Sequence, residues 1–261
     1  MGYAALTMQN FTTAHETYNT AVGYQAGNNI TTGVQNTIIG SLAGDALTDA
    51  DHNTAVGLAT LGADTLGSRS TALGYGCLTT QNFTTATNAY NTAVGMNAGL
   101  DVTTGIQNTF LGGEAGASIT DADYNVAIGY AALDADTLGS RSTALGYATL
   151  SNQNFTTATN GNNTAVGYHA GNAITTGTHN VCIGANAGDE MTTGAGNTIV
   201  GSAALGTGIA TGDDNTVLGR NAALSITSGS NNLLLGHDAG RSGSPGGNIT
   251  TASNTIVLGD E

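Results

Sequence analysis

The sequence predicts an all-β protein, a parallel β-solenoid in which each short repeat forms one turn. An Asn/Ser-Thr-apolar-apolar-Gly signature, first seen at Asn19 in NTAVG, returns with a period of mostly about 17 residues. Glycine is frequent, at 40 of 261 residues, and no segment shows helical periodicity of useful length. Repeats this short cannot bury a core alone, so they must stack on one another.

The signature defines about 14 turns and a longer second period. Three short intervals followed by a longer one give a super-repeat of about 72 residues, so the block that opens at Asn19 opens again at Asn91. We expect a repetitive solenoid over 1–241, in blocks 19–90, 91–162 and 163–241. The stretch 242–261 is expected to be an insertion and a terminal turn, beginning at Asn254, that leads into a further C-terminal region. Copies of the signature begin at positions 19, 36, 53, 70, 91, 108, 125, 142, 163, 180, 197, 215, 232 and, slightly stretched, 254.

Three positions of the turn, counted from the opening Asn or Ser, indicate how it packs. The fifth is always glycine, as expected where φ is positive or another chain segment comes close. The eighth is small, and together with a large fourth position it predicts two closely packed short strands in each turn. The fourth is always aliphatic, which predicts an inward-facing core ladder. This ladder comprises Val22, Ile39, Val56, Leu73, Val94, Leu111, Ile128, Leu145, Val166, Ile183, Val200, Leu218 and Leu235.

Composition and charge exclude several classes of partner. The net charge is −14, and the only basic residues are Arg69, Arg141, Arg220 and Arg241. No basic stripe is present to neutralise phosphates, so we expect no nucleic-acid partner and no binding to an anionic membrane surface. No apolar run approaches the ~20 residues of a membrane span, so no membrane insertion is expected.

The two cysteines, Cys77 and Cys182, replace small apolar residues of the repeat. They lie several turns apart, too far for an intrachain disulfide, and we expect both to be buried free thiols.

The repeats resemble those of two families of surface fibre. NTAVGYQAG, NTAVGYHAG and STALGYGCL are similar to repeats of bacteriophage tail fibres, and more distantly to the head repeats of trimeric autotransporter adhesins. The resemblance covers nearly the whole chain and implies a homotrimeric, left-handed β-roll that forms the shaft or head of a fibre. The turn is longer here than the adhesin repeat, which favours the phage comparison. SNTIVLGDE at the end is similar to the lead-in to a self-cleaving chaperone domain.

Loop carboxylates are the weak candidates for a metal site. Asp49 and Asp51 lie in one loop, and Asp121 and Asp123 lie at equivalent positions one super-repeat later. Asp-x-Asp in a turn can contribute to Ca²⁺ binding, which needs six or more oxygen ligands, but the glycine and glutamate of known calcium loops are missing. A solvated acidic loop is therefore favoured, and no cofactor is expected. Histidines do not recur at matching positions; they are His15, His52, His169, His179 and His237.

No constellation of catalytic residues stands out, so the chain is expected not to be an enzyme. A glycan-depolymerising spike is one alternative, but it would need paired carboxylates facing a groove. The glutamates, Glu16, Glu114, Glu190 and Glu261, are not placed by the repeat.

An ice-binding solenoid is a second alternative. It is suggested by the matched threonines at the second position, although this row breaks at Val126, Val181 and Leu233. Threonine rows also simply stabilise stacked turns.

The long turns hold the candidate recognition residues. Phe11, Phe83 and Phe155, with Tyr18 and Tyr90, recur one super-repeat apart among Asn, Gln and Thr. Aromatic and amide side chains suit sugar contacts, although folding of each Phe back over the core is the favoured interpretation.

We therefore expect a non-enzymatic structural and adhesive fibre segment, in a virion tail fibre or at a cell surface. Its expected partners are two identical chains and a host cell-surface glycan or protein.

Overall fold

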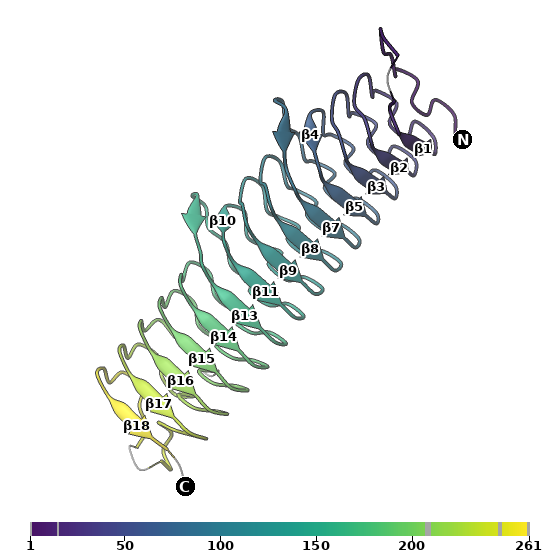
Figure 1. The fold of residues 1–261 in the computed structure, drawn as a ribbon. Helices are drawn as coiled ribbons and strands as arrows, with labels where there is room; N and C mark the ends of the chain where they lie inside the picture. The colour runs from purple at the N-terminus through teal and green to yellow at the C-terminus, as the bar shows by residue number, and fades with distance from the viewer. Residues whose placement is uncertain (1, 15, 207–209, 245–246, 260–261) are drawn as a thin grey trace. The chain divides into compact units, whose positions relative to one another are not determined.

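The computed structural model describes residues 2–14, 16–206, 210–244 and 247–259. They form two compact units, Met1–Asn125 and Val126–Glu261, and each is an all-β parallel solenoid without helices among its described residues (Figure 1). The predicted fold class is thus confirmed, while the homotrimer stays a prediction. The boundary between the units falls inside the predicted block 91–162. His15, Pro245 and Gly246 lie outside the described residues.

The first unit has one three-residue strand per turn. Each strand pairs in parallel with the strand of the next turn, so that threonine lies opposite threonine along the row. A separate short pair, β4 with β6, closes the long turn. The strands are β1 (Thr20–Val22), β2 (Thr37–Ile39), β3 (Thr54–Val56), β4 (Gly67–Ser68), β5 (Thr71–Leu73), β6 (Thr87–Asn88), β7 (Thr92–Val94) and β8 (Thr109–Leu111).

The second unit repeats this plan. Its three-residue strands again pair in parallel, turn by turn, and the pair β10 with β12 closes its long turn. The strands are β9 (Val126–Ile128), β10 (Gly139–Ser140), β11 (Thr143–Leu145), β12 (Thr159–Asn160), β13 (Thr164–Val166), β14 (Val181–Ile183), β15 (Thr198–Val200), β16 (Thr216–Leu218), β17 (Leu233–Leu235) and β18 (Ile256–Leu258).

The predicted core ladder at the fourth position is wrong. In β5 the middle residue, Ala72, is fully buried, whereas Leu73 is 45% exposed. The same alternation holds in β8, where Phe110 is buried and Leu111 is exposed. Successive side chains of a strand point to opposite faces, so a strand with its third position inside turns its second and fourth positions outward. The core therefore contains the third position, and the invariant aliphatics lie on the surface.

The eighth position is buried, as its small size predicts, but it does not lie in a second strand. Ala43, Thr60 and Cys77 are fully buried in turn segments that follow the main strand. Facing them inside the short turns are large apolar residues at the twelfth position, such as Ile30 and Leu47. Each turn thus has one three-residue strand beside a narrow interior, and the turns at the two long loops add a two-residue strand, β4, β6, β10 or β12.

The opening Asn of each turn forms a buried hydrogen-bonded ladder. The Asn53 backbone N–H donates to Asn36 Oδ1 at 2.8 Å, and the Ser70 N–H donates in turn to Asn53 Oδ1 at 2.8 Å. Asn53 Nδ2 donates to the Gly67 carbonyl at 2.8 Å, across the interior of its own turn. Buried amides satisfied in this way fix the register of neighbouring turns.

The corners of the turn need left-handed backbone. Gly57 has φ 135°, and a Cβ there would lie 1.8 Å from the Gly74 carbonyl oxygen, so only glycine fits the fifth position. Other corners hold residues with side chains in the same region, as at Gln35 (φ 60°), Ala59 (φ 57°) and Leu61 (φ 50°). Cross-turn backbone bonds, such as Ala59 N–H to the Ser41 carbonyl at 3.0 Å, hold these strained corners in place.

The last turn starts one residue later than predicted. The Thr255 N–H, rather than that of Asn254, donates to Asn232 Oδ1 at 2.9 Å, and Ile256 pairs with Leu233. Thr255 is therefore the opening residue of this turn, and Asn254 is the corner residue before it.

Candidate functional site

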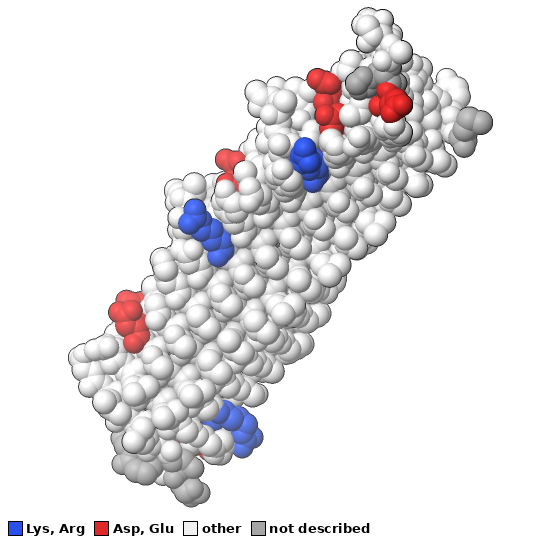
Figure 2. Space-filling model, viewed as in Figure 1, with Lys and Arg blue, Asp and Glu red and all other residues white. Residues whose placement is uncertain are grey.

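The outward face of the main strands is the most extensive surface feature of each unit. Its second-position row is mostly threonine and its fourth-position row is aliphatic, so neither row contains a charged residue. Leu111, Leu145 and Leu218 are 46%, 42% and 47% exposed. In Figure 2 the surface over the middle strands of each unit is white, and coloured atoms lie at its borders. Exposed apolar rows of this kind are typical of an interaction surface.

A stack of aromatic rings borders this face in the second unit. Tyr147 lies between Tyr130 and Tyr168, with ring centroids 5.7 Å and 5.4 Å apart. His169 stacks on Tyr168 at 4.2 Å and on Tyr147 at 5.5 Å. All three tyrosines are about half exposed. Sequence reasoning missed this stack, although the regular Gly-Tyr spacing in the repeats could have indicated it.

The predicted recognition residues separate into two groups. The rings of Phe83 and Phe155 are only 5% exposed, and Phe11 is half-buried, so the long-turn phenylalanines fold back against their own chain. Tyr18 and Tyr90 are exposed. The Arg69 guanidinium lies 5.8 Å from the centroid of the Tyr90 ring.

The predicted calcium candidates are tied to the preceding turn. Asp51 Oδ1 accepts the Val34 N–H at 2.8 Å, and Asp123 Oδ1 accepts the Ile106 N–H at 2.7 Å. The Asp49 carboxylate accepts the Thr32 hydroxyl.

Asp121 repeats the contact of Asp49 with the Thr104 hydroxyl. Among the described residues no group of three or more His, Cys, Asp or Glu is arranged to hold a metal ion.

The histidines, too, contact neighbours on adjacent turns or nearby side chains. His179 Nε2 lies 3.1 Å from Asn162 Nδ2, and His237 Nε2 lies 2.7 Å from an Arg220 guanidinium nitrogen. His52 is an exposed corner residue with φ 61°.

Each long turn and the 17-residue turn before it share a buried polar network that sequence reasoning missed. Asp64 is fully buried at the twelfth position of the turn that precedes the long turn, where turns away from a long loop bury an apolar residue such as Ile30 or Leu47. Its Oδ1 accepts the N–H groups of Gly67 at 3.0 Å and Phe83 at 3.1 Å, and its Oδ2 accepts Gln81 Nε2 at 2.5 Å. Gln81 Oε1 in turn accepts Asn91 Nδ2 at 2.8 Å. Burial raises the pKa of the Asp64 carboxyl, and the hydrogen bond from Gln81 offsets this only in part.

The same network recurs one super-repeat later. Asp136 Oδ1 accepts the N–H groups of Gly139 and Phe155, each at 3.1 Å, and Asp136 Oδ2 accepts Gln153 Nε2 at 2.5 Å. Burial raises the pKa of Asp136 as well. The repeated Asp-Thr-Leu-Gly-Ser-Arg-Ser segment was the signal in the sequence, because a repeated Asp three residues before Gly is suited to accept that glycine's N–H.

The pKa values of Asp189 and Cys182 are also raised. Burial, with a smaller contribution from the adjacent Glu190 carboxylate, raises the pKa of Asp189 to about 6. Burial raises the pKa of the Cys182 thiol to about 12, and the Asp189 charge adds to this effect. Cys77 and Cys182 are both buried and free, as predicted. A thiol that stays protonated is a poor nucleophile, so Cys182 is suited to packing rather than to chemistry.

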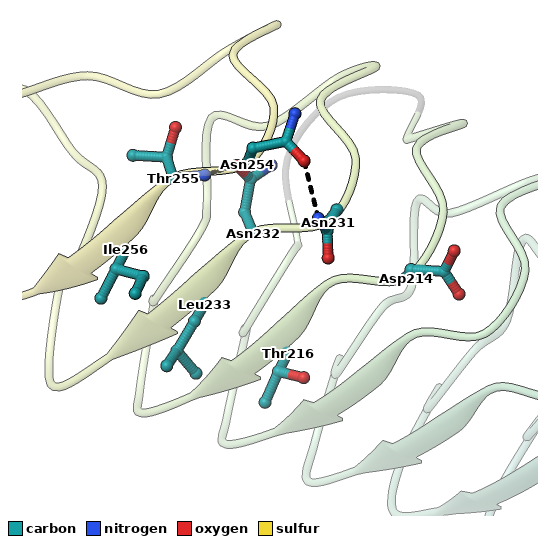
Figure 3. A pocket seen from close by; sticks show the side chains of 8 residues that line it. All are labelled: Asp214, Thr216, Asn231, Asn232, Leu233, Asn254, Thr255 and Ile256. Atoms are coloured by element: carbon teal, nitrogen blue, oxygen red, sulfur yellow. Dashed lines mark hydrogen bonds between the residues drawn. The ribbon is translucent and has the colours of Figure 1, made fainter.

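A hollow of about 370 Å³ opens near the last strands of the second unit (Figure 3). Polar side chains from three successive corners line one side, and residues of β16, β17 and β18 line the other. In Figure 3 the amides of Asn231 and Asn254 lie together, joined by a hydrogen bond of 2.7 Å, with Asp214 on the next turn. The lining residues are Asp214, Thr216, Asn231, Asn232, Leu233, Asn254, Thr255 and Ile256.

Comparison with known proteins finds no matching family model, no similar curated protein and no similar solved structure. Within the described ranges no helix has the length and hydropathy of a membrane span.

Proposed function

We propose that this chain is a non-enzymatic structural and adhesive segment of a surface fibre, working as a homotrimer in a phage tail fibre. Its task is mechanical, since a stack of hydrogen-bonded turns holds a receptor-binding tip at a fixed distance from the particle. A head segment of a bacterial trimeric adhesin is the nearest alternative, with the same architecture and the same interface. The similarity of the repeats to both kinds of fibre supports the proposal.

The observation that carries it is the exposed fourth-position row. Burying a half-exposed leucine stabilises an interface by roughly 1 kcal/mol, and the row offers one such residue per turn. A second copy is the partner that matches the row best, because its own aliphatics repeat at the same spacing between turns. The chain's net charge of −14 would repel another copy elsewhere, whereas these rows carry no charge. Three copies can close into a ring that leaves no open apolar face.

Sedimentation equilibrium tests the assembly. We expect three times the mass of the chain for the natural sequence. Leu73→Asp with Leu145→Asp, one change in each exposed row, should give the mass of a single chain with an unchanged circular dichroism spectrum. Thr84→Asp, on an exposed long turn away from both rows, is the matched control and should remain trimeric. A single-chain mass for the natural sequence would overturn the proposal.

Ice binding is the second candidate, because one observation favours it. In the first unit the outward threonines of six strands lie directly opposite one another, with no break from Thr20 to Thr109. An ice-binding face must be exposed, whereas the same face is covered in the proposed trimer. Thermal hysteresis in a single-chain sample would favour this second function, and its absence would remove it.

A further inference from the structure

We infer that the hollow lined by Asp214, Asn231, Asn254, Thr216, Leu233 and Ile256 binds one ring of a neutral saccharide (Figure 3). The inference names the chemical class of a partner of the second unit, and it does not rest on the proposed trimer. Thr216, Leu233 and Ile256 lie on the outward strand face that the trimer would cover, so sugar binding and trimer assembly exclude each other at the hollow. Binding itself is a property of the second unit and is measured separately.

The hollow exists because the corner side chains are short here. The corner residue before each opening position has a positive φ, and in other turns it is often long, as at Gln35, Arg69 and Tyr90. In the second unit four successive corners are Gly196, Asp214, Asn231 and Asn254. With no long side chain to fill it, the space beside the outward residues of β16, β17 and β18 stays open.

The polar groups around the hollow are positioned for hydroxyl groups. Asn231 Nδ2 donates to Asn254 Oδ1 at 2.7 Å, which fixes both amides and leaves Asn231 Oδ1 as an acceptor and Asn254 Nδ2 as a donor. Among the described residues, no side-chain hydrogen bond is made by the Asp214 carboxylate or the Thr216 hydroxyl. A sugar hydroxyl donating to the Asp214 carboxylate would form a charge-assisted hydrogen bond, the stronger kind.

The other wall is apolar. Leu233 is 36% exposed and Ile256 is 72% exposed, at outward positions that hold threonine in most turns. A pyranose ring has one face of C–H groups and a rim of hydroxyls. Its C–H face can lie on Leu233 and Ile256 while its hydroxyls meet the corner residues, so the two walls match the two kinds of surface on one sugar ring.

Other small ligands fit less well. An anion would be repelled by Asp214 and by the net charge of −14. Calcium takes six to eight oxygens, and the hollow offers one carboxylate with a few amide and hydroxyl oxygens. The volume of about 370 Å³ is at the small end for a binding site, which suits a single ring. Because the hollow is open to solvent, we expect a dissociation constant on the order of 1 mM.

Saturation-transfer difference NMR with glucose, galactose, mannose and N-acetylglucosamine tests the inference on the full chain carrying Leu73→Asp with Leu145→Asp, so that no second copy covers the hollow. We expect signal transfer to at least one of them. Asp214→Ala should weaken it at least tenfold, and Asn231→Tyr should do the same by filling the hollow with a side chain that Tyr90 already places at this corner. Asn162→Ala, a corner change in the same unit outside the hollow, is the control and should leave the transfer unchanged.

Three results would overturn the inference: no transfer to any of the sugars, transfer unchanged in Asn231→Tyr, or transfer abolished by added Ca²⁺ that binds at Asp214. Thermal unfolding of each variant shows whether it is folded, and if Asp214→Ala is not, Asn231→Tyr decides. No sugar binding by the single-chain variant would remove only this inference and would leave the trimer of the natural sequence untouched. A single-chain mass for the natural sequence, with sugar binding, would remove only the trimer.

Discussion

Turns beside a long loop and turns away from one place opposite kinds of residue at the same point of their interior. At the twelfth position, the short turns bury Ile30 and Leu47, and the turns next to the long loop bury Asp64 and Gln81. Both interiors are closed to solvent, but one is held by apolar packing and the other by a satisfied hydrogen-bond network. The solenoid thus tolerates these fully buried carboxylates where the loop supplies their donors.

Moving a carboxylate into a turn with an apolar interior should have the largest effect. Leu47→Asp places an acid at the position of Asp64 without a glutamine partner or a folded-back loop, so its burial is uncompensated. We expect a loss of more than about 4 kcal/mol in the free energy of unfolding, measured by guanidinium denaturation. Leu47→Met, which keeps the volume, should cost less than about 1.5 kcal/mol. Equal losses for the two variants would contradict the contrast.

Removing the carboxylate that binds the long turn from the turn before it should come next. Asp64→Ala leaves Gly67 N–H, Phe83 N–H and Gln81 Nε2 without their acceptor, and we expect a loss of about 3 kcal/mol. Asp49→Ala, at an exposed loop carboxylate, should stay within about 0.5 kcal/mol of the natural sequence. Were Asp64→Ala as harmless as Asp49→Ala, the network would not be what holds the long turn.

Acid should stabilise the polar interiors. The pKa values of Asp64 and Asp136 are raised by burial above those of the unfolded chain, and that of Asp189 lies at about 6. Protonation therefore favours the folded state. This contribution is complete below the unfolded value of about 3.9 and is lost as pH rises through the folded values.

The unfolding free energy should thus increase, by about 1 kcal/mol after allowance for solvent screening at the partly exposed Asp189, between about pH 7 and about pH 5. The double variant Asp64→Asn with Asp136→Asn removes the two network carboxylates but keeps the other surface charges. Its pH dependence should be flatter over the whole range from about pH 7 down to the unfolded value of about 3.9, and an identical pH dependence over that range would count against raised pKa values in the networks.

Changes at a corner should have the smallest effect and should not distinguish the two kinds of turn. Ala59 and Gln25 occupy the same corner, with φ 57° and 53°, in a polar and an apolar turn. Asparagine tolerates this conformation better, and Asn97 already has it. Ala59→Asn and Gln25→Asn should each raise the unfolding free energy by about 0.5 kcal/mol. The melting temperature of each variant measures the effect. A rise in only one variant would mean that the kind of residue in the interior of a turn changes the stability of its corner.

The period of the repeat could be predicted from the sequence. The same pattern did not predict which positions of each strand point into the core and which point outward. A constant aliphatic at the fourth position resembles a core, yet it is constant because similar side chains stack in register on the outside, as Leu73 does on Val94. Inside, the third position varies from Ala72 to Phe110, since each must fit a different partner across its turn. Alternation along the strand was the usable signal, because threonine at the second position places the fourth on the same outer face.

The polar networks and the hollow depend on contacts across turns. Asp64 and Gln81 come from successive turns and lie in a core only because the long loop returns with Phe83 over Gly67. No local pattern in the sequence predicts that the long loop folds back in this way. The hollow at Asp214 likewise depends on the register of the last turn. The sequence pattern predicted that this turn begins at Asn254, one residue too early.

Thiol labelling tests the facing of the strands most directly, because Cys182 and Ile183 are neighbours on one strand. Cys182 points inward and is 1% exposed, whereas Ile183 points outward and is 39% exposed. In the folded natural sequence neither thiol should react with a maleimide, and both should react after unfolding. Ile183→Cys, combined with Leu73→Asp and Leu145→Asp so that no second copy covers the row, should add one fast-reacting thiol. Rapid labelling of Cys182 in the folded chain, or a silent Cys at 183, would contradict this account.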